Sequence, residues 1–166
     1  AERDAAALFR AIVDTLDPDR AEAVAREAGR LTADYILAHR IPPRAQAVLG
    51  ALPASLAGRL LLMAIKRHAW TFAGSGKVSI TAFPMTLSIT GNPLTMPGCP
   101  WHCAVLHTLF CNLVSAQAEV RATLSCPRGD RTWHFHIDWP RVTQRGSAGH
   151  GPSGSARSMA PAEADQ

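Results

Sequence analysis

The alternation of apolar and polar residues divides the chain into a helical first half and a second half that also contains strands. In the first half, apolar residues recur every three or four positions, which is the spacing of one helical face. This spacing predicts helices at residues 2–16, 20–38, 44–52 and 55–70. The expected core residues of the second helix are Val24, Leu31, Tyr35 and Ile36. The fourth predicted helix is apolar on most sides, so we expect it to be buried.

After a break at residues 73–77 the period changes to two, which is typical of strands. Strands are predicted at residues 77–83, 85–90, 119–126 and 133–139, with a helix at residues 101–117 between the two pairs. Residues 141–166 contain almost nothing to bury, which predicts a disordered tail. The predicted fold class is α+β. N-terminal helices (1–76) would pack on a ββαββ core with an antiparallel sheet (77–140), as one domain.

Composition agrees with one folded domain, since 47% of the 166 residues are hydrophobic. The net charge of +4 is not gathered into a block of five like charges, so we expect no nucleic-acid partner. Four cysteines are too few for a disulfide scaffold, and the charged opening residues do not resemble a signal peptide. The longest apolar run, residues 60–65, is too short to span a bilayer. These features predict a cytoplasmic protein with reduced thiols, and they leave a peripheral membrane contact open.

Candidate chemistry concentrates in one stretch, CPWHCAVLHTLFC, at residues 99–111. Cys103, His107 and Cys111 follow one another at i, i+4 and i+8, so a helix would align them in one stripe. Thiolate and imidazole groups in such a stripe suit zinc or an iron–sulfur cluster. Three interpretations stay open: a metal site, the lining of a ligand pocket, and core packing, since free cysteine is often buried as a small hydrophobe.

His134 and His136 alternate with apolar residues in the last predicted strand, so both would lie on the face opposite the aromatic residues. A solvent-facing position and a ligand role are the two alternatives for them. The glycines near residue 75 lack the pattern of a phosphate loop, and no GxGxxG sequence or Ser-His-Asp motif stands out. The sequence therefore carries no fingerprint of a nucleotide, nicotinamide or flavin cofactor.

The second half of the chain resembles the vinyl-4-reductase domain, a small-molecule-binding module also seen in phenol-sensing transcription activators. The resemblance runs from Leu87 to Ile137: an Asn-Pro loop, a cysteine that opens a helix, a strand that ends in cysteine, a Gly-Asp hairpin and a strand with a central Phe. In the first half, LTADYILAHRIP (residues 31–42) and HAWTFAGSG (residues 68–76) resemble the BchJ family of bacteriochlorophyll-synthesis proteins, long called 4-vinyl reductases. Together these segments reach across most of the chain before the tail.

For sensor members of the family, the resemblance implies a zinc site made of a helix cysteine, a strand glutamate and two further cysteines. Cys103 and Cys126 match the first and third of these ligands, whereas Thr123 stands in the place of the glutamate. After the hairpin, Trp133 or His134 stands in the place of the last cysteine. A zinc site would therefore need histidines as substitutes, and the predicted set of metal ligands is Cys103, Cys126, His107 and His134.

The resemblance also implies a role in the chlorophyll branch of tetrapyrrole synthesis in a photosynthetic bacterium. We expect the chain to bind a Mg-tetrapyrrole, such as divinyl protochlorophyllide or a Mg-protoporphyrin, as a carrier or accessory factor. Other enzymes of the pathway are the expected partners, with a homodimer as a further alternative and the photosynthetic membrane as a peripheral location. An 8-vinyl reductase and a ligand-sensing module are the alternative functions. Whether the chain is an enzyme stays open, because vinyl reduction needs a hydride or electron source.

A tetrapyrrole needs a large apolar cleft with few polar anchors, and the helices at residues 55–70 and 101–117 are the candidates to line it. Imidazole is a candidate axial ligand for the central magnesium, although magnesium generally prefers oxygen. Aromatic rings can stack on the macrocycle, and a lysine can pair with a propionate. The expected ligand-binding residues are His107, His68, Trp70, Phe72, Trp101, Phe110 and Lys77.

Overall fold

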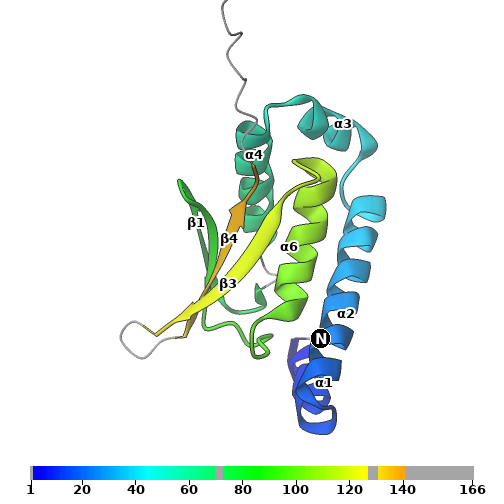
Figure 1. Cartoon of the computed structure of the whole chain (residues 1–166), viewed down its shortest axis with the longest axis vertical. Coiled ribbons are helices and arrows are strands. Elements are labelled where there is room, and N and C mark those ends of the chain that lie inside the picture. The colour runs from blue at the N-terminus through cyan, green and yellow to red at the C-terminus, as the bar shows by residue number, and fades with distance from the viewer. Residues whose placement is uncertain (1, 70–72, 127–130, 141–166) are drawn as a thin grey trace, which may run out of the picture.

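A computed structural model describes residues 2–69, 73–126 and 131–140 (Figure 1). The described helices are α1 (Glu2–Thr15), α2 (Pro18–His39), α3 (Pro43–Ala51), α4 (Ala54–Arg67) and α6 (Pro100–Leu113). The described strands are β1 (Lys77–Ala82), β2 (Met85–Thr90), β3 (Glu119–Ser125) and β4 (Thr132–Asp138). The α+β class and the ββαββ order of the second half are confirmed. The predicted tail lies outside the described residues, and the division into domains stays a prediction.

Local sequence explains where the helices begin. The side chain of Asp17 caps α2 by accepting a hydrogen bond of 3.0 Å from the backbone N–H of Arg20. Pro18 follows at the first helical position, where its missing N–H costs nothing. At the start of α6, Cys99 adopts a left-handed conformation with φ of 49°, and Pro100 opens the helix. The cysteine-rich stretch therefore forms a helix, as its spacing predicted.

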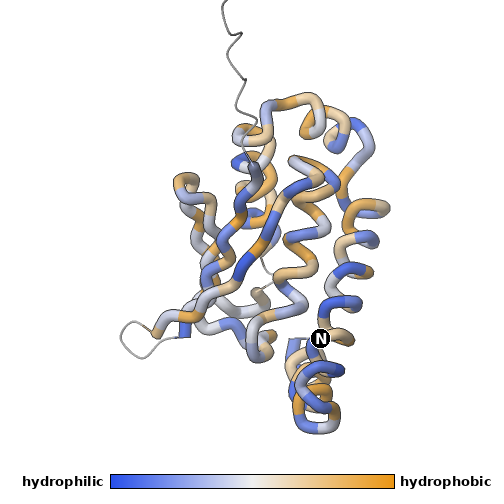
Figure 2. The backbone as a smooth tube through the Cα atoms, in the orientation of Figure 1, coloured by the Kyte–Doolittle hydropathy of each residue, from blue (hydrophilic) through white to orange (hydrophobic). Residues whose placement is uncertain are grey.

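The four described strands form one antiparallel sheet in the order β1-β2-β4-β3. Across the sheet, Ile80 pairs with Leu87, Leu87 with Phe135, and Phe135 with Ala122. This register places an apolar row on one face, because successive side chains of a strand point to opposite sides. Figure 2 shows the same alternation between hydrophilic and hydrophobic residues along β3. The other face carries Ser, Thr and His side chains.

The apolar face of the sheet packs against α6 and α4, and these elements form the main core. The buried residues of α6 are Pro100, His102, Cys103, Val105, Leu106, Leu109, Phe110 and Leu113. Those of α4 are Ala57, Gly58, Leu61, Leu62 and Ile65. Because the helices cover one face, the chain has two layers, and α2 runs beside α6 in Figure 1.

The predicted core of α2 was wrong for three of its four residues. Val24, Leu31 and Tyr35 are exposed, whereas Ile36 is half-buried and packs against the main core. The helix instead turns a stripe of small residues inward, namely Ala21, Ala25, Gly29 and Ala33. A Cβ atom at Gly29 would overlap the carbonyl oxygen of Trp101, so α2 and α6 are in backbone contact at this point. Sequence reasoning chose the larger apolar residues, whereas close helix packing requires the smallest ones.

The expectation that α4 is buried holds for only one of its faces. Its inward face is buried in the core, but Leu56, Leu60 and Met63 on its outward face are exposed. The described part of α4 ends at Arg67, before the predicted end at residue 70. None of the described helices has the length and apolar content that a membrane span requires.

Candidate functional site

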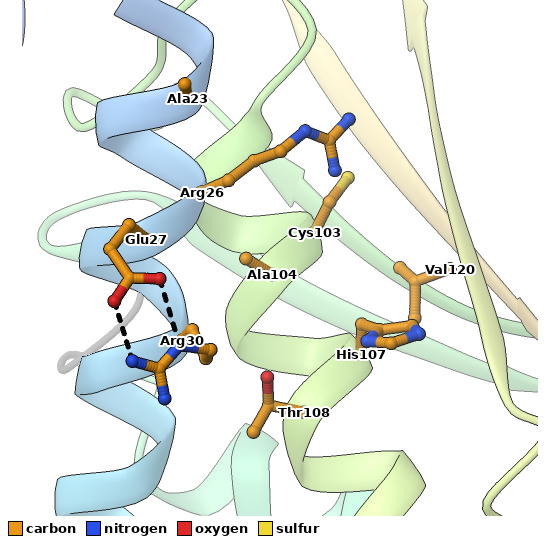
Figure 3. A pocket seen from close by; sticks show the side chains of 9 residues that line it. All are labelled: Ala23, Arg26, Glu27, Arg30, Cys103, Ala104, His107, Thr108 and Val120. Atoms are coloured by element: carbon orange, nitrogen blue, oxygen red, sulfur yellow. Dashed lines mark hydrogen bonds and ion pairs between the residues drawn. The ribbon is translucent and has the colours of Figure 1, made fainter.

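A cleft of about 440 Å³ opens between α2, α6 and β3 (Figure 3). It is lined by residues of all three elements: Ala23, Arg26, Glu27, Arg30, Cys103, Ala104, His107, Thr108 and Val120. The inward stripe of small residues on α2 (Ala21, Ala25, Gly29 and Ala33), here called the α2 seam, brings α2 and α6 close together. Longer side chains beside the seam form the walls of the cleft. The cleft therefore arises from the same close packing that overturned the predicted α2 core.

The predicted cysteine-histidine stripe forms one wall of the cleft. Cys103 and His107 both line it, and Figure 3 shows His107 beside Val120 of β3. Cys103 is buried at the base of the stripe, whereas His107 is exposed and reachable from solvent. The third member, Cys111, lies one turn further along, with its Sγ 3.5 Å from the Nε2 of His107. The stripe thus offers one accessible imidazole next to two thiols.

Two arginines of α2 form the opposite wall. Arg30 makes a bidentate ion pair with Glu27, at 2.6 and 2.9 Å, and a second ion pair of 2.6 Å with Asp34. Arg26 pairs with Glu22 at 2.7 Å. The hydrogen bond from Arg30 lowers the pKa of the Glu27 carboxyl, so both partners are charged at neutral pH. Since all these side chains are solvent-exposed, the pairs are weak, and an incoming carboxylate can replace a protein one.

The thiols near the start of α6 are protonated at neutral pH. Burial raises the pKa of the Cys99 thiol to about 12. Burial also raises the pKa of Cys103, and the neighbouring Arg26 guanidinium opposes this effect without reversing it. A protonated thiol is a poor nucleophile. The Cys103 side chain therefore contributes an uncharged group to the wall of the cleft.

The four predicted metal ligands do not come together. Cys103 and His107 share the cleft, but Cys126 is exposed just beyond β3, at the end of the strand where Leu124 is also exposed. His134 lies on the far face of the sheet, where it is hydrogen-bonded to Ser residues. Among the described residues, no three His, Cys, Asp or Glu side chains are grouped as a metal site would need.

The polar face of the sheet holds the two strand histidines, as the period of two predicted. Each ring nitrogen of His134 is within hydrogen-bond distance of a hydroxyl, at 2.8 Å from Ser88 and 2.7 Å from Ser125. His136 is held in the same way by two threonines of β2 and β3, at 3.2 and 3.0 Å. These contacts join the three neighbouring strands, so both histidines have a structural role in the sheet.

The other predicted ligand residues that the structure describes do not line the cleft. Phe110 is fully buried and stacks on Trp139, with ring centroids 6.5 Å apart. Trp101 is half-buried and packs edge-on against Phe9 at 5.9 Å. His68 and Lys77 are exposed, at the end of α4 and the start of β1. Trp70 and Phe72 lie outside the described residues.

Sequence reasoning missed the contribution of α2 to the cleft. Arg26, Glu27 and Arg30 lie beside the small-residue stripe, in the stretch AREAGR at residues 25–30. The signal that could have found them is the recurrence of Ala, Ala, Gly and Ala every four residues from Ala21. Such a stripe marks a helix face that packs closely, and polar residues next to it then border the helix–helix groove.

Comparison with known proteins gave two close matches. The chain is 43% identical over 143 residues to the bacteriochlorophyll synthase 23 kDa chain of Cereibacter sphaeroides, a match that covers 82% of this chain and 69% of the relative. It is 43% identical over 126 residues to the protein of the same name from Rhodobacter capsulatus, covering 70% of this chain and 59% of the relative. The match therefore leaves 31% of the first relative and 41% of the second uncovered. No protein-family model and no solved structure matches the chain.

Proposed function

Because the chain belongs to the family of the bacteriochlorophyll synthase 23 kDa chains, we propose that it acts in bacteriochlorophyll synthesis by binding a Mg-tetrapyrrole in the cleft between α2, α6 and β3. The pigment would be an intermediate of the divinyl protochlorophyllide or Mg-protoporphyrin type. In this proposal the chain is a carrier or accessory factor of the pathway.

The observation that carries the proposal is the position of His107. Its imidazole is exposed in the wall of a cleft that also holds apolar groups, Cys103, Ala104 and Val120. An imidazole in such a wall can approach the central magnesium of a flat macrocycle from one side. The volume of about 440 Å³ lies within the roughly 300–1,000 Å³ that ligand pockets occupy.

The arginines supply a complementary anchor for the acidic side chains of a tetrapyrrole. A guanidinium binds a carboxylate through two parallel hydrogen bonds, which fixes orientation as well as charge. Arg26 and Arg30 flank the cleft, and their present acidic partners are exposed and exchangeable. A propionate of the pigment would therefore replace Glu22 or Glu27 as the partner of one arginine.

The relatives are named as a chain of bacteriochlorophyll synthase, and we propose that this chain likewise associates with an enzyme of the tetrapyrrole pathway. A carrier needs a site from which the pigment can leave, and the open side of the cleft at His107 suits such transfer. The alternative that the resemblance implies is reduction of the 8-vinyl group by a vinyl-4-reductase domain. Conversion of divinyl to monovinyl pigment by the purified chain with a reductant would favour that alternative.

Binding of Mg-protoporphyrin and of metal-free protoporphyrin to the wild type and to His107→Phe tests the proposal by absorbance titration. The phenylalanine keeps the bulk of the side chain but removes the nitrogen ligand. We expect the affinity for the magnesium pigment to fall about tenfold, which corresponds to about 1.4 kcal/mol. The affinity for the metal-free pigment should fall much less, because it offers no axial position.

His39→Phe is the matched control, because His39 is exposed on α2 but does not line the cleft. This control should leave both affinities unchanged. Arg30→Gln, a second variant in the cleft, should lower the affinity for both pigments by the same factor. An equal loss for both pigments in His107→Phe would mean that His107 only packs against the ligand. Unchanged affinities in both cleft variants would place pigment binding outside this cleft and contradict the proposal.

A further inference from the structure

We propose that the outward face of α4, together with the turn between β1 and β2, is a docking surface for an anionic lipid bilayer. This surface, here called the α4 face, consists of Leu56, Arg59, Leu60, Met63, Arg67 and Phe83. It combines exposed apolar side chains with positive charge that has no acidic partner within the described part of the chain. It shares no residue with the cleft, so the inference does not rest on pigment binding.

The apolar part of the α4 face is a continuous helical stripe. Leu56, Leu60 and Met63 are spaced at i, i+4 and i+7, so they lie on one side of the helix. They are 43%, 38% and 51% exposed, although the inward side of the same helix is buried in the core. Phe83, at the tip of the turn, is 71% exposed. Large apolar residues gathered in this way are typical of a surface that contacts a partner or a membrane.

Two observations place the turn beside the helix. The guanidinium carbon of Arg59 lies 5.8 Å from the centre of the Phe83 ring, in a cation–π arrangement. Inside the molecule, a Cβ atom at Gly58 would lie 3.0 Å from Met85, the first residue of β2. The apolar stripe of α4 and the ring of Phe83 therefore lie next to each other, so both can insert into the same bilayer surface.

The charge of this region is strongly one-sided. Residues 35–118 contain six Lys and Arg residues and no Asp or Glu, whereas residues 1–34 contain eight acidic and five basic residues. Arg59 and Arg67, with Lys66 at the edge of the stripe, have no acidic partner among the described residues, unlike the arginines of the cleft. A helix that exposes leucines flanked by basic residues is typical of binding to an anionic membrane surface.

Charge decides between the candidate occupants. A second copy of the chain would bring two positive surfaces together, and their repulsion would oppose pairing through this face. Anionic lipid headgroups supply the missing negative charge, while the acyl region receives the leucine, methionine and phenylalanine side chains. Arginine can keep its charged end at the headgroups while its stem covers apolar surface. A bilayer thus satisfies both the apolar and the charged part of the face.

Flotation of the purified chain with protein-free vesicles tests the proposal. We expect binding to phosphatidylcholine vesicles that contain about 30% phosphatidylglycerol, little binding to phosphatidylcholine alone, and a decrease as salt is raised. The double variant Arg59→Gln/Arg67→Gln and the double variant Leu60→Ser/Met63→Ser should each weaken the partition about tenfold or more. Circular dichroism and thermal unfolding check that both variants remain folded.

The matched control is Arg20→Gln/Leu31→Ser, which makes the same two kinds of change at exposed positions of α2. It should bind the anionic vesicles like the wild type. Equal binding of folded α4-face variants and the control would overturn the proposal, as would equal binding to neutral and anionic vesicles. Binding to membranes only when their proteins are present would also overturn it and identify a protein as the partner of this face.

Discussion

Helices α2 and α4 both contain large apolar residues at helical spacing, yet they use them in opposite ways. Helix α4 buries Leu61, Leu62 and Ile65 against the sheet. Helix α2 exposes Leu31 and Tyr35, and packs on α6 through alanines and one glycine. The size of the buried residues follows the distance to the neighbouring backbone: a helix over a sheet leaves room for leucine, whereas the α2–α6 contact at Gly29 leaves room for none.

This difference has a functional consequence. A closely packed helix pair gains dispersion contacts along the seam, and its flanking side chains stand out as the walls of a groove. Bulky residues in the seam would separate α2 from α6 and change the shape of the cleft that holds His107. The small-residue seam therefore positions the candidate site, while the leucine-rich face of α4 mainly stabilises the core.

The largest expected effect is the difference in stability between a leucine removed from α4 and a leucine removed from α2. Leu62→Ala in α4 removes a side chain that is 1% exposed and should lower the free energy of unfolding by about 2–5 kcal/mol. Leu31→Ala in α2 removes one that is 53% exposed and should change it by less than about 0.5 kcal/mol. Urea unfolding followed by circular dichroism measures both. A large decrease in the free energy of unfolding of Leu31→Ala would show that the exposed side of α2 is packed. The difference between α2 and α4 would then disappear.

A smaller effect tests the closeness of the seam. Gly29→Ala should destabilise the chain by about 1–3 kcal/mol, because the added methyl group meets the carbonyl of Trp101 and the Cβ of Ala104. Gly50→Ala, in α3, is the matched control, since nothing lies within 4 Å of its added Cβ. That change should stabilise the chain by about 0.5–1 kcal/mol, through lower entropy of the unfolded state. Equal shifts of the melting temperature in both variants would mean that α2 and α6 can move apart at Gly29 without a loss of stability.

The smallest effect concerns Cys99, at the start of the helix on which α2 packs. Burial raises the pKa of the Cys99 thiol from 9.0 to about 12. The folded chain therefore keeps this proton up to a higher pH than the unfolded chain does. The resulting stability is fully present below about pH 9 and is lost as the pH rises toward 12. Between about pH 9 and 10 the free energy of unfolding should fall by up to about 1.4 kcal/mol more in the wild type than in Cys99→Ala. If the free energy of unfolding had the same pH dependence in the wild type and in Cys99→Ala, the Cys99 thiol would not be desolvated in the folded chain.

Much of the fold follows from local patterns in the chain. The change of period from helical spacing to alternation correctly predicted the ββαββ order, because side-chain direction alternates in any strand regardless of its partners. The same alternation placed His134 and His136 on the polar face, and the i, i+4, i+8 spacing aligned Cys103 with His107. These predictions succeeded because they depend on backbone geometry within one element.

Partnerships between elements could not be obtained in this way. The position of β4 between β2 and β3, the separation of Cys126 and His134 from Cys103, and the arginine wall of the cleft all depend on how distant segments pack. Hydrophobic spacing selected the face of α2 with the larger apolar residues, but the position of α6 decided that the small-residue face is the buried one. The sequence alone thus determined the elements and the faces of the strands, whereas the tertiary structure decided the α2 seam and the composition of the site, because steric fit between two surfaces is a property of both.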